Sequence, residues 1–211
     1  MKYLNPTYYL DYQTTDIQNI ISEFQDSNFT DKDKAIGIYF KIRDNWRYNP
    51  YNISFNKDSY KASNISGKTE GHCIDKSILL VACLRGLSIP ARIHLAKVKN
   101  HIGVERFIEK YGTNEISPHG MVDLYIEGRW LKVSPAFNVE LCQKCNVAPL
   151  NFDGENDSLF QQFDNEGNNF MEYLEDYGHF EDVPTDFIFE NFKSNYPSIF
   201  ERFNGEGELK I

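Results

Sequence analysis

The sequence predicts an α+β fold, with helices near the N-terminus, a buried central helix, a β-hairpin and a helical acidic segment at the C-terminal end. An uninterrupted apolar run from Ile74 to Leu87 is typical of a buried helix. Residues 119–133 alternate apolar and polar side chains around a short turn, which is typical of two paired strands. Together with two helical patterns upstream, these segments indicate the α+β class.

Two segments near the N-terminus carry apolar residues at helical spacing. Thr15 and Asp16 can cap the first helix, which continues to Phe24. The second runs from Asp31 to about Trp46 and is broken by Asn49-Pro50. Residues 47–70 are rich in Asn, Ser, Lys and Tyr, so we expect a long loop, and loops of this length in compact domains are commonly functional.

The central helix is followed by the clearest local prediction in the chain. Ser88-Ile89-Pro90 ends the helix, and residues 91–95 have the pattern of a strand. His119–Ile126 and Arg129–Val133 form two further strands joined by Glu127-Gly128, a length that fits a two-residue hairpin. In that register residue 123 lies opposite residue 132, which predicts an ion pair between Asp123 and Lys132.

The C-terminal segment is acidic but rich in phenylalanine. Residues 151–211 hold 15 acidic and three basic side chains, together with ten phenylalanines. A solvated tail has little use for so many large apolar side chains, so we expect this segment to fold onto the rest. Helices are predicted over residues 159–163, 170–174 and 187–192, the last beginning near Pro184. The whole chain, 1–211, is expected to form a single domain.

Composition excludes several classes of protein. The chain has 211 residues with 41% hydrophobic and 15% aromatic side chains, which argues against disorder. Its net charge of −9 does not suit a partner with a phosphate backbone, so we expect no nucleic acid partner. No apolar run is long enough to span a bilayer, and the first residues lack the apolar core of a signal peptide. We therefore expect a cytoplasmic protein without a membrane partner, in which the four cysteines are reduced.

Cys73 is the strongest candidate for chemistry. It stands where the polar loop enters the apolar helix, so backbone N–H groups and the helix dipole are expected to favour its thiolate. Gly71 allows the backbone to approach closely at this point. Cys83 lies inside the apolar run and is expected to be a core residue.

A thiolate nucleophile needs a base, which is most often histidine. The five candidates are His72, His94, His101, His119 and His179. His119 opens a predicted strand on its non-core face, a suitable position for presenting an imidazole to a cleft, whereas spacing alone does not decide among the five.

Cys142 and Cys145 form an isolated C-x-x-C pair. A structural zinc site needs a second pair of ligands at suitable spacing, and His179 stands alone after the pair. No metal is therefore predicted, although a zinc-binding interaction module built on this pair is an alternative. A thioredoxin-like role lacks the surrounding βαβ pattern.

Two blocks together resemble the transglutaminase-like superfamily. Gly71-His72-Cys73, followed by SILLVACLRGLSIPARI, is similar to the superfamily's nucleophile motif, and HGMVDLYIEGRWLKVSPAFN is similar to its histidine strand and hairpin. The resemblance covers about residues 35–138. It implies a papain-like arrangement, with the nucleophile helix packed on an antiparallel sheet that carries the base.

By position, the resemblance makes Cys73 the nucleophile and His119 the base. The third residue is usually an Asp before a Pro, and the corresponding residue here is Ser134. Asn138 is an alternative for that role, because Cys-His-Asn triads occur in papain-like enzymes.

The resemblance implies a cysteine hydrolase or acyltransferase that acts on a peptide or another amide through a thioester and needs no cofactor. Superfamily members that have lost catalysis make a binding domain the main alternative, and the serine at position 134 is its best support.

Overall fold

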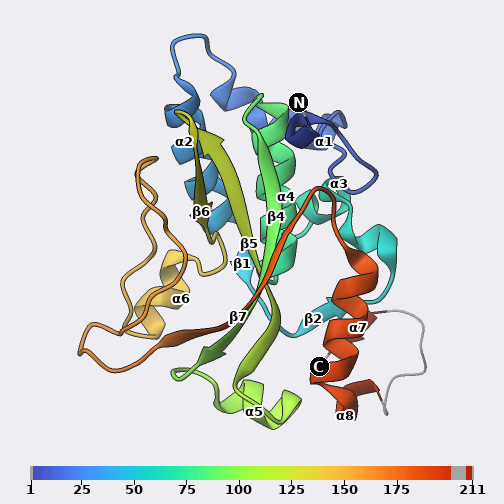
Figure 1. Cartoon of the computed structure of the whole chain (residues 1–211), viewed down its shortest axis with the longest axis vertical. Helices are drawn as coiled ribbons and strands as arrows, with labels where there is room; N and C mark the ends of the chain where they lie inside the picture. Colours follow the sequence, from blue (N-terminus) through green and yellow to red (C-terminus); the bar gives the residue numbers. More distant parts are fainter. Residues whose placement is uncertain (1, 201–207, 211) are drawn as a thin grey trace.

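A four-stranded antiparallel sheet lies at the centre of the structure, in the order β6-β5-β4-β7 (Figure 1). The computed structural model describes residues 2–200 and 208–210, with side chains for residues 2–199. The helices are α1 (Thr15–Ile21), α2 (Asp31–Asn45), α3 (Ala62–Ser66), α4 (Cys73–Gly86), α5 (Glu105–Tyr111), α6 (Val139–Lys144), α7 (Thr185–Asn195) and α8 (Pro197–Phe200). The strands are β1 (Arg47–Tyr48), β2 (Asn52–Ser54), β3 (Glu70–Gly71), β4 (Ala91–Asn100), β5 (Glu115–Ile126), β6 (Arg129–Val133), β7 (Met171–Phe180) and β8 (Glu208–Lys210). These elements confirm the α+β class.

The hairpin of β5 and β6 has the register that the sequence predicts. Val122 pairs with Val133, and Asp123 pairs with Lys132. Glu127 and Gly128 both have positive φ, at 50° and 84°, as a two-residue turn of the favoured hand requires. The central pair of the sheet, β4 and β5, is also antiparallel.

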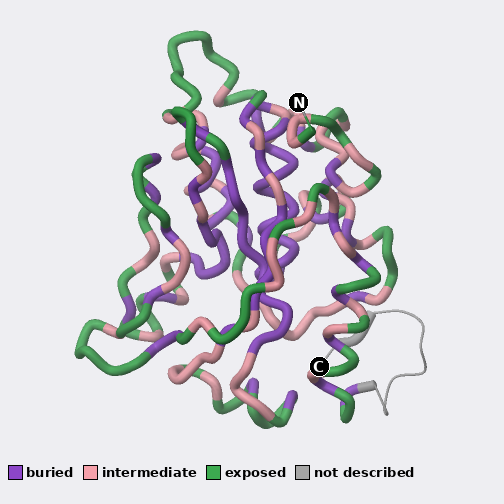
Figure 2. Tube along the Cα trace, viewed as in Figure 1, coloured by how far each residue is buried: buried purple, intermediate pink, exposed green. Residues whose placement is uncertain are grey.

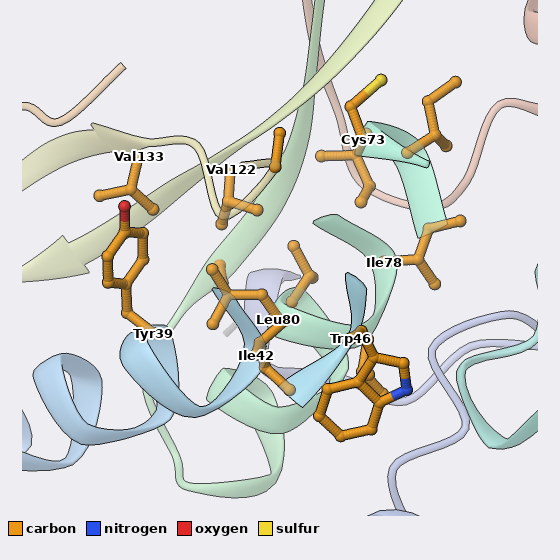
Figure 3. Packing of buried hydrophobic residues seen from close by; sticks show 14 of the residues in the cluster. Tyr39, Ile42, Trp46, Cys73, Ile78, Leu80, Val122 and Val133 are labelled. Carbon is orange, nitrogen blue, oxygen red and sulfur yellow. The ribbon is translucent and has the colours of Figure 1, made fainter. Parts of the chain in front are cut away.

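Helix α4 is the centre of the core. Its residues from Cys73 to Arg85 are all buried, as Figure 2 shows for the helix behind the sheet. It packs against α1, α2 and α3 as well as against β4 and β5. Side chains from α2, α4, β5 and β6 meet in one apolar cluster (Figure 3). The uninterrupted apolar run is therefore the consequence of a helix that is covered on all sides.

The long segment before α4 is more structured than a loop. The expected bounds are confirmed for α2, where Thr30 and Asp33 form a reciprocal cap. The first helix is present but differs: its N-cap position is Thr14 rather than Thr15 or Asp16, and α1 ends at Ile21, with a 3-10 turn continuing to Phe24. Residues 47–71, however, contain short strands and helical turns, and β1 pairs with β3 in parallel. This pairing brings the end of the segment back beside its beginning, immediately before Cys73.

The acidic segment follows the sequence prediction only in part. Helix α7 confirms the helix expected near Pro184. The helices expected over residues 159–163 and 170–174 are wrong: the first region has no helix, and the second begins strand β7. The strand forms because β4 would otherwise leave its outer edge of N–H and C=O groups without partners, and tertiary pairing outweighs local pattern.

The predicted ion pair between Asp123 and Lys132 is also wrong, although the two residues are opposite each other. The Asp123 carboxylate instead accepts from Arg92 Nε and pairs with His94 Nδ1, both at 2.8 Å across the β4–β5 ladder. His94 Nε2 lies 2.9 Å from Asp176 of β7. The buried imidazole between two carboxylates outcompetes the half-buried lysine, and it joins three strands on one face of the sheet.

Candidate active site

The start of α4 fixes the position of Cys73. The preceding residue, His72, is extended and caps the helix, because its Nδ1 accepts a hydrogen bond from the Asp75 N–H at 3.2 Å. Burial lowers the pKa of His72, which keeps the ring neutral and Nδ1 free to accept. The Asp75 carboxylate in turn lies 3.3 Å from Lys68 Nζ. Cys73 is therefore the first residue of a helix whose first turn is held in place by its neighbours.

The Cys73 thiol is a neutral group in this structure. It is buried, and Figure 3 shows its sulfur at the edge of the aliphatic cluster, turned away from Ile42 and Leu80. Burial raises the pKa of Cys73 to about 11, while the backbone N–H groups of Gly120 and Ile74 act in the opposite direction. The expectation of a lowered pKa for Cys73 is wrong. Removal from water destabilises the thiolate more than the N–H groups at the helix start stabilise it.

Strand β5 meets the start of α4 at Gly120. A Cβ atom on Gly120 would lie 2.7 Å from Ile74 Cα and 2.9 Å from Ile74 N, closer than van der Waals contact permits. The backbones of the strand and the helix therefore touch at this point, and only glycine fits. The residue before Gly120 on the strand is His119.

His119 is buried and incompletely paired. It lies opposite Ala96 in the β4–β5 ladder and is only 1% exposed. Burial lowers its pKa to about 4, so its ring is neutral at neutral pH. Its Nδ1 has no hydrogen-bond partner among the described residues, and within the same part of the chain no hydrogen bond joins its ring to Cys73. A buried polar atom without a partner costs about 1–3 kcal/mol and calls for an explanation.

Neither candidate for the third residue satisfies that nitrogen. Ser134 follows the last pair of the hairpin ladder; its N–H donates to Ser158 O at 2.8 Å, and its carbonyl accepts from Tyr39 Oη at 3.1 Å. The Asn138 carbonyl oxygen accepts from the Tyr48 N–H at 3.0 Å, and its amide nitrogen donates to Glu140. Both residues are buried close to the end of β6. The side-chain oxygen and nitrogen of Asn138 both already have hydrogen-bond partners.

The family model of the transglutaminase-like superfamily matches residues 18–135, which is more than half of the chain. The chain belongs to the transglutaminase-like superfamily. A search of curated proteins gave no match. Among solved structures, a protein from Cytophaga hutchinsonii that is named, provisionally, as a cysteine protease matches with 22% identity and a TM-score of 0.47; the match covers 64% of this chain and 40% of that one.

The sequence did not single out Lys76, which lies three residues after the superfamily's cysteine position. Its side chain is fully buried, and its Nζ donates to Arg43 O at 2.7 Å and to Ala136 O at 2.8 Å. It therefore ties α4 to the end of α2 and to the segment that follows Ser134. Burial lowers the pKa of Lys76 to about 7. Two carbonyl acceptors from different segments, which sequence patterns do not encode, explain why a lysine is tolerated inside an apolar run.

The remaining candidates have structural surroundings of their own. His94 lies between Asp123 and Asp176 as described above, and His101 pairs with Glu172 at 3.0 Å. The His179 ring packs edge-on against Tyr3.

All four cysteines are free, and Cys83 is a core residue as expected. In residues 2–199, no three His, Cys, Asp or Glu side chains come together as a possible metal site. None of the described helices is long and apolar enough to cross a membrane.

The contact at Gly120 generates the first prediction. Gly120→Ala forces strand β5 away from the backbone of Ile74, and we expect a loss of about 1–3 kcal/mol in the free energy of unfolding. The matched control is Gly67→Ala, because a Cβ there meets nothing closer than Asn64 O at 3.9 Å. Urea unfolding of the two variants measures the difference. Equal stability of the two variants would contradict a backbone contact at Gly120.

The second prediction concerns Lys76 and pH. Its pKa falls from 10.5 in the unfolded chain to about 7 in the folded one, so between these values the unfolded state binds more protons. The free energy of unfolding of the wild type should therefore rise relative to that of Lys76→Met as the pH increases from 7 to 9.5, by an amount on the order of a few kcal/mol. Below pH 7 both states are protonated and the difference should be constant.

Denaturant unfolding of both proteins across this pH range measures the effect. The Met variant also leaves Arg43 O and Ala136 O without a donor, which lowers stability by the same amount at every pH. Only the slope with pH reports the titration. Parallel curves for the two proteins would contradict a destabilised ammonium at position 76.

Proposed function

We propose that the protein is a cysteine hydrolase or acyltransferase that acts on an amide bond through a thioester on Cys73. The observation that carries the proposal is the backbone contact at Gly120, which brings the strand of His119 against the first residues of α4. The unpaired Nδ1 of the buried His119 supports it, because a nitrogen that bonds no other group is available for a proton. Membership of the superfamily agrees with both residues and with their order in the chain.

The protonation states favour general-base catalysis. In the closed site the thiol and the imidazole are both neutral, so His119 can accept the thiol proton as the sulfur attacks. The Cys73 S–C bond forms, the proton passes from His119 to the leaving nitrogen, and the C–N bond of the amide breaks. Water or an amine then attacks the thioester, the S–C bond breaks, and the proton returns to the thiol. The steps consume only an amide and water or an amine.

The first turn of α4 supplies the stabilising groups. As the carbonyl carbon becomes tetrahedral, negative charge develops on its oxygen, which needs N–H donors. The N–H groups at the start of α4, that of Cys73 among them, have no acceptor within the helix. The substrate is a peptide or another amide-containing molecule, and Ser134 is the position from which the imidazole would be oriented.

A binding domain without catalysis is the second candidate. The observation that favours it is the serine at position 134, because a hydroxyl cannot stabilise an imidazolium as the usual Asp would. The two candidates differ in whether Cys73 forms a covalent intermediate.

The third prediction tests this difference with an activated ester. p-Nitrophenyl acetate should give a burst of p-nitrophenol equal to the amount of protein, and mass spectrometry should place one acetyl group on Cys73. Cys73→Ala should abolish the burst, and His119→Ala should slow it by about 100-fold or more.

Two matched controls guard against loss of folding. Cys83→Ala removes a core thiol in the same helix, and His101→Ala removes a histidine directly after strand β4. Both should retain the burst. Acetylation elsewhere with Cys73 unmodified, or a burst that survives Cys73→Ala, would refute the proposed nucleophile.

The fourth prediction concerns position 134. Ser134→Asp introduces a carboxylate, which should raise the pKa of His119 and stabilise a thiolate–imidazolium pair. Iodoacetamide should then label Cys73 about tenfold faster at pH 7. Ser134→Asn introduces a side chain of the same shape as Asp but without its charge. It should leave the labelling rate of Cys73 near that of the wild type. Equal rates for the Asp and Asn variants would remove Ser134 from the third position.

A further inference from the structure

The imidazole of His94 is held by two carboxylates from two different strands. Its Nδ1 lies 2.8 Å from Asp123 Oδ1 on β5, and its Nε2 lies 2.9 Å from Asp176 Oδ1 on β7. The residue is only 3% exposed. A neutral imidazole has one N–H donor and one acceptor nitrogen, whereas the imidazolium has two donors. Only the protonated ring can donate to both ionised carboxylates, so this geometry belongs to the charged form of His94.

The two carboxylates differ in their surroundings. Asp123 is 1% exposed and also accepts from Arg92 Nε at 2.8 Å. The side chain of Asp176 is 48% exposed, and its second oxygen lies 4.0 Å from Lys132 Nζ. When the ring loses one proton, the other stays on Nδ1, because Asp176 can turn toward water and the buried Asp123 cannot. Loss of the proton therefore breaks the bond to β7 and keeps the bond to β5.

His94 is the group in this network that changes its charge near neutral pH. Burial would lower the pKa of His94, but the hydrogen bonds and charges of its two carboxylate partners outweigh burial, and the pKa is raised above 6.5. His179 lies opposite His94 in the β4–β7 ladder, and partial burial, reinforced by the charge of Arg92, lowers its pKa. Tyr173 interacts with Asp176, and burial raises the pKa of Tyr173 to about 12.

Asp176 also closes a bulge in strand β7. Tyr177 has no partner residue in the β4–β7 ladder, and Asp176 Oδ1 accepts from the Gly178 N–H across it at 2.7 Å. A bulge redirects the side chain of its extra residue. Here the Tyr177 hydroxyl lies 2.9 Å from Ser117 Oγ on β5. The bond from Asp176 to His94 therefore anchors the point of the strand from which Tyr177 projects.

Strand β7 supports the beginning of helix α7. Figure 1 shows that the chain leaves β7, turns and returns directly as α7. Phe187 in the first turn of α7 packs on Tyr177 and Phe180 of β7, with ring centroids 5.4 and 5.6 Å apart. A movement of the bulge would therefore reach the first turn of α7 through direct side-chain contact.

Helix α7 is part of the wall that encloses the thiol. Ile188, Phe189 and Phe192 line a pocket beside Cys73, which is only 4% exposed. The pocket encloses about 40 Å³, which is room for no more than about one or two water molecules. An amide substrate can reach the sulfur only after part of this wall has moved.

The other side-chain bonds of α7 involve no histidine among the described residues. They join Asn191 to Ser117, Thr185 to Tyr9 and Asp186 to Lys57. These bonds hold the helix without a group whose ordinary pKa lies between 6 and 9. The part of the closure that depends on pH is therefore the support from β7.

We propose that His94 is a proton-dependent clasp that controls access to Cys73. As an imidazolium it bonds β7 to β4 and holds the first turn of α7 over the pocket. When its Nε2 proton passes to solvent, Asp176 is released and the wall loosens at the bulge. Access to the thiol therefore rises from slightly acidic to alkaline pH. The clasp does not depend on any reaction at Cys73, but its meaning as regulation rests on the proposed function.

Alkylation of Cys73 tests the clasp without catalysis. In His94→Asn the amide nitrogen takes the place of Nδ1 beside Asp123 and nothing reaches Asp176, as in the neutral ring. At pH 6, iodoacetamide should label Cys73 about tenfold faster in this variant than in the wild type. At pH 9.5 the two rates should be equal, because the wild-type ring has also lost its proton. Comparison at equal pH cancels the ionisation of the thiol itself. A ratio near one at pH 6, or the same ratio at both pH values, would overturn the proposal.

Two controls separate the clasp from general loosening. Cys83 is fully buried in the same helix and should stay unlabelled in both proteins, since it becomes accessible only on unfolding. His101→Asn removes another histidine that bonds a β7 carboxylate, Glu172 at 3.0 Å, at the end of β7 remote from α7. This variant should label Cys73 at the wild-type rate at both pH values. Acceleration equal to that of His94→Asn would assign the effect to any weakening of β7 and refute the clasp.

Urea unfolding tests the bond between His94 and Asp176 directly. Because the folded pKa of His94 is raised, the bond stabilises the protein below pH 6.5 and is lost as the pH rises through the folded value. At pH 6, Asp176→Ala should lower the ratio of folded to unfolded protein about fivefold more in the wild type than in His94→Asn. At pH 9.5 the substitution should have the same effect in both backgrounds. Coupling that is equal at both pH values would contradict a proton-dependent bond.

The acetyl burst from p-nitrophenyl acetate distinguishes this proposal from the proposed function. The expected labelling ratios without any burst at Cys73 would refute the cysteine chemistry and leave the clasp standing. A burst at Cys73 together with labelling ratios that do not change with pH would refute the clasp and leave the proposed function standing.

Discussion

The site depends on one contact, the approach of strand β5 to the first turn of helix α4 at Gly120. Two backbones touch there, with no room for a Cβ atom between them. The contact fixes the depth of the strand relative to the helix, and the hairpin register then fixes the face on which each neighbour lies. His119 and Ser134 inherit their positions from this arrangement. A shift of one residue in β5 would send every one of these side chains to the opposite face.

The close approach of β5 to the start of α4 also explains the pKa shifts at the site. When a helix end and a strand meet without a gap, water is excluded, and burial becomes the largest influence on Cys73, His119 and Lys76 alike. Burial disfavours the charged form of each group, so the thiol and the imidazole are neutral. A neutral pair suits a mechanism in which the proton moves during attack. A thiolate–imidazolium pair would be favoured by a carboxylate beside the imidazole, which position 134 does not supply.

Sequence patterns predicted the parts of the fold that local periodicity encodes. The hairpin register and helix α4 follow from alternation and from an uninterrupted apolar run, and the same patterns placed Cys73 at the start of a helix and His119 on a strand. Strand β7 was missed because its pairing with β4 joins residues 71 to 87 positions apart in the chain, from Asn100 with Met171 to Ile93 with Phe180. Lys76 was missed because its acceptors are backbone carbonyls, which have no sequence signature. The raised pKa of Cys73 depends on three-dimensional burial for the same reason.

Tyr48 links these separate features. Its backbone N–H holds the Asn138 side chain, and β1, in which it lies, pairs with β3 directly before the start of α4. Tyr48 also lines the pocket beside Cys73. Tyr48 therefore contacts the segment after the hairpin, the approach to α4 and the wall of the pocket beside Cys73. A substitution that displaced the Tyr48 backbone would therefore disturb the side chain of Asn138 and the approach to Cys73 together.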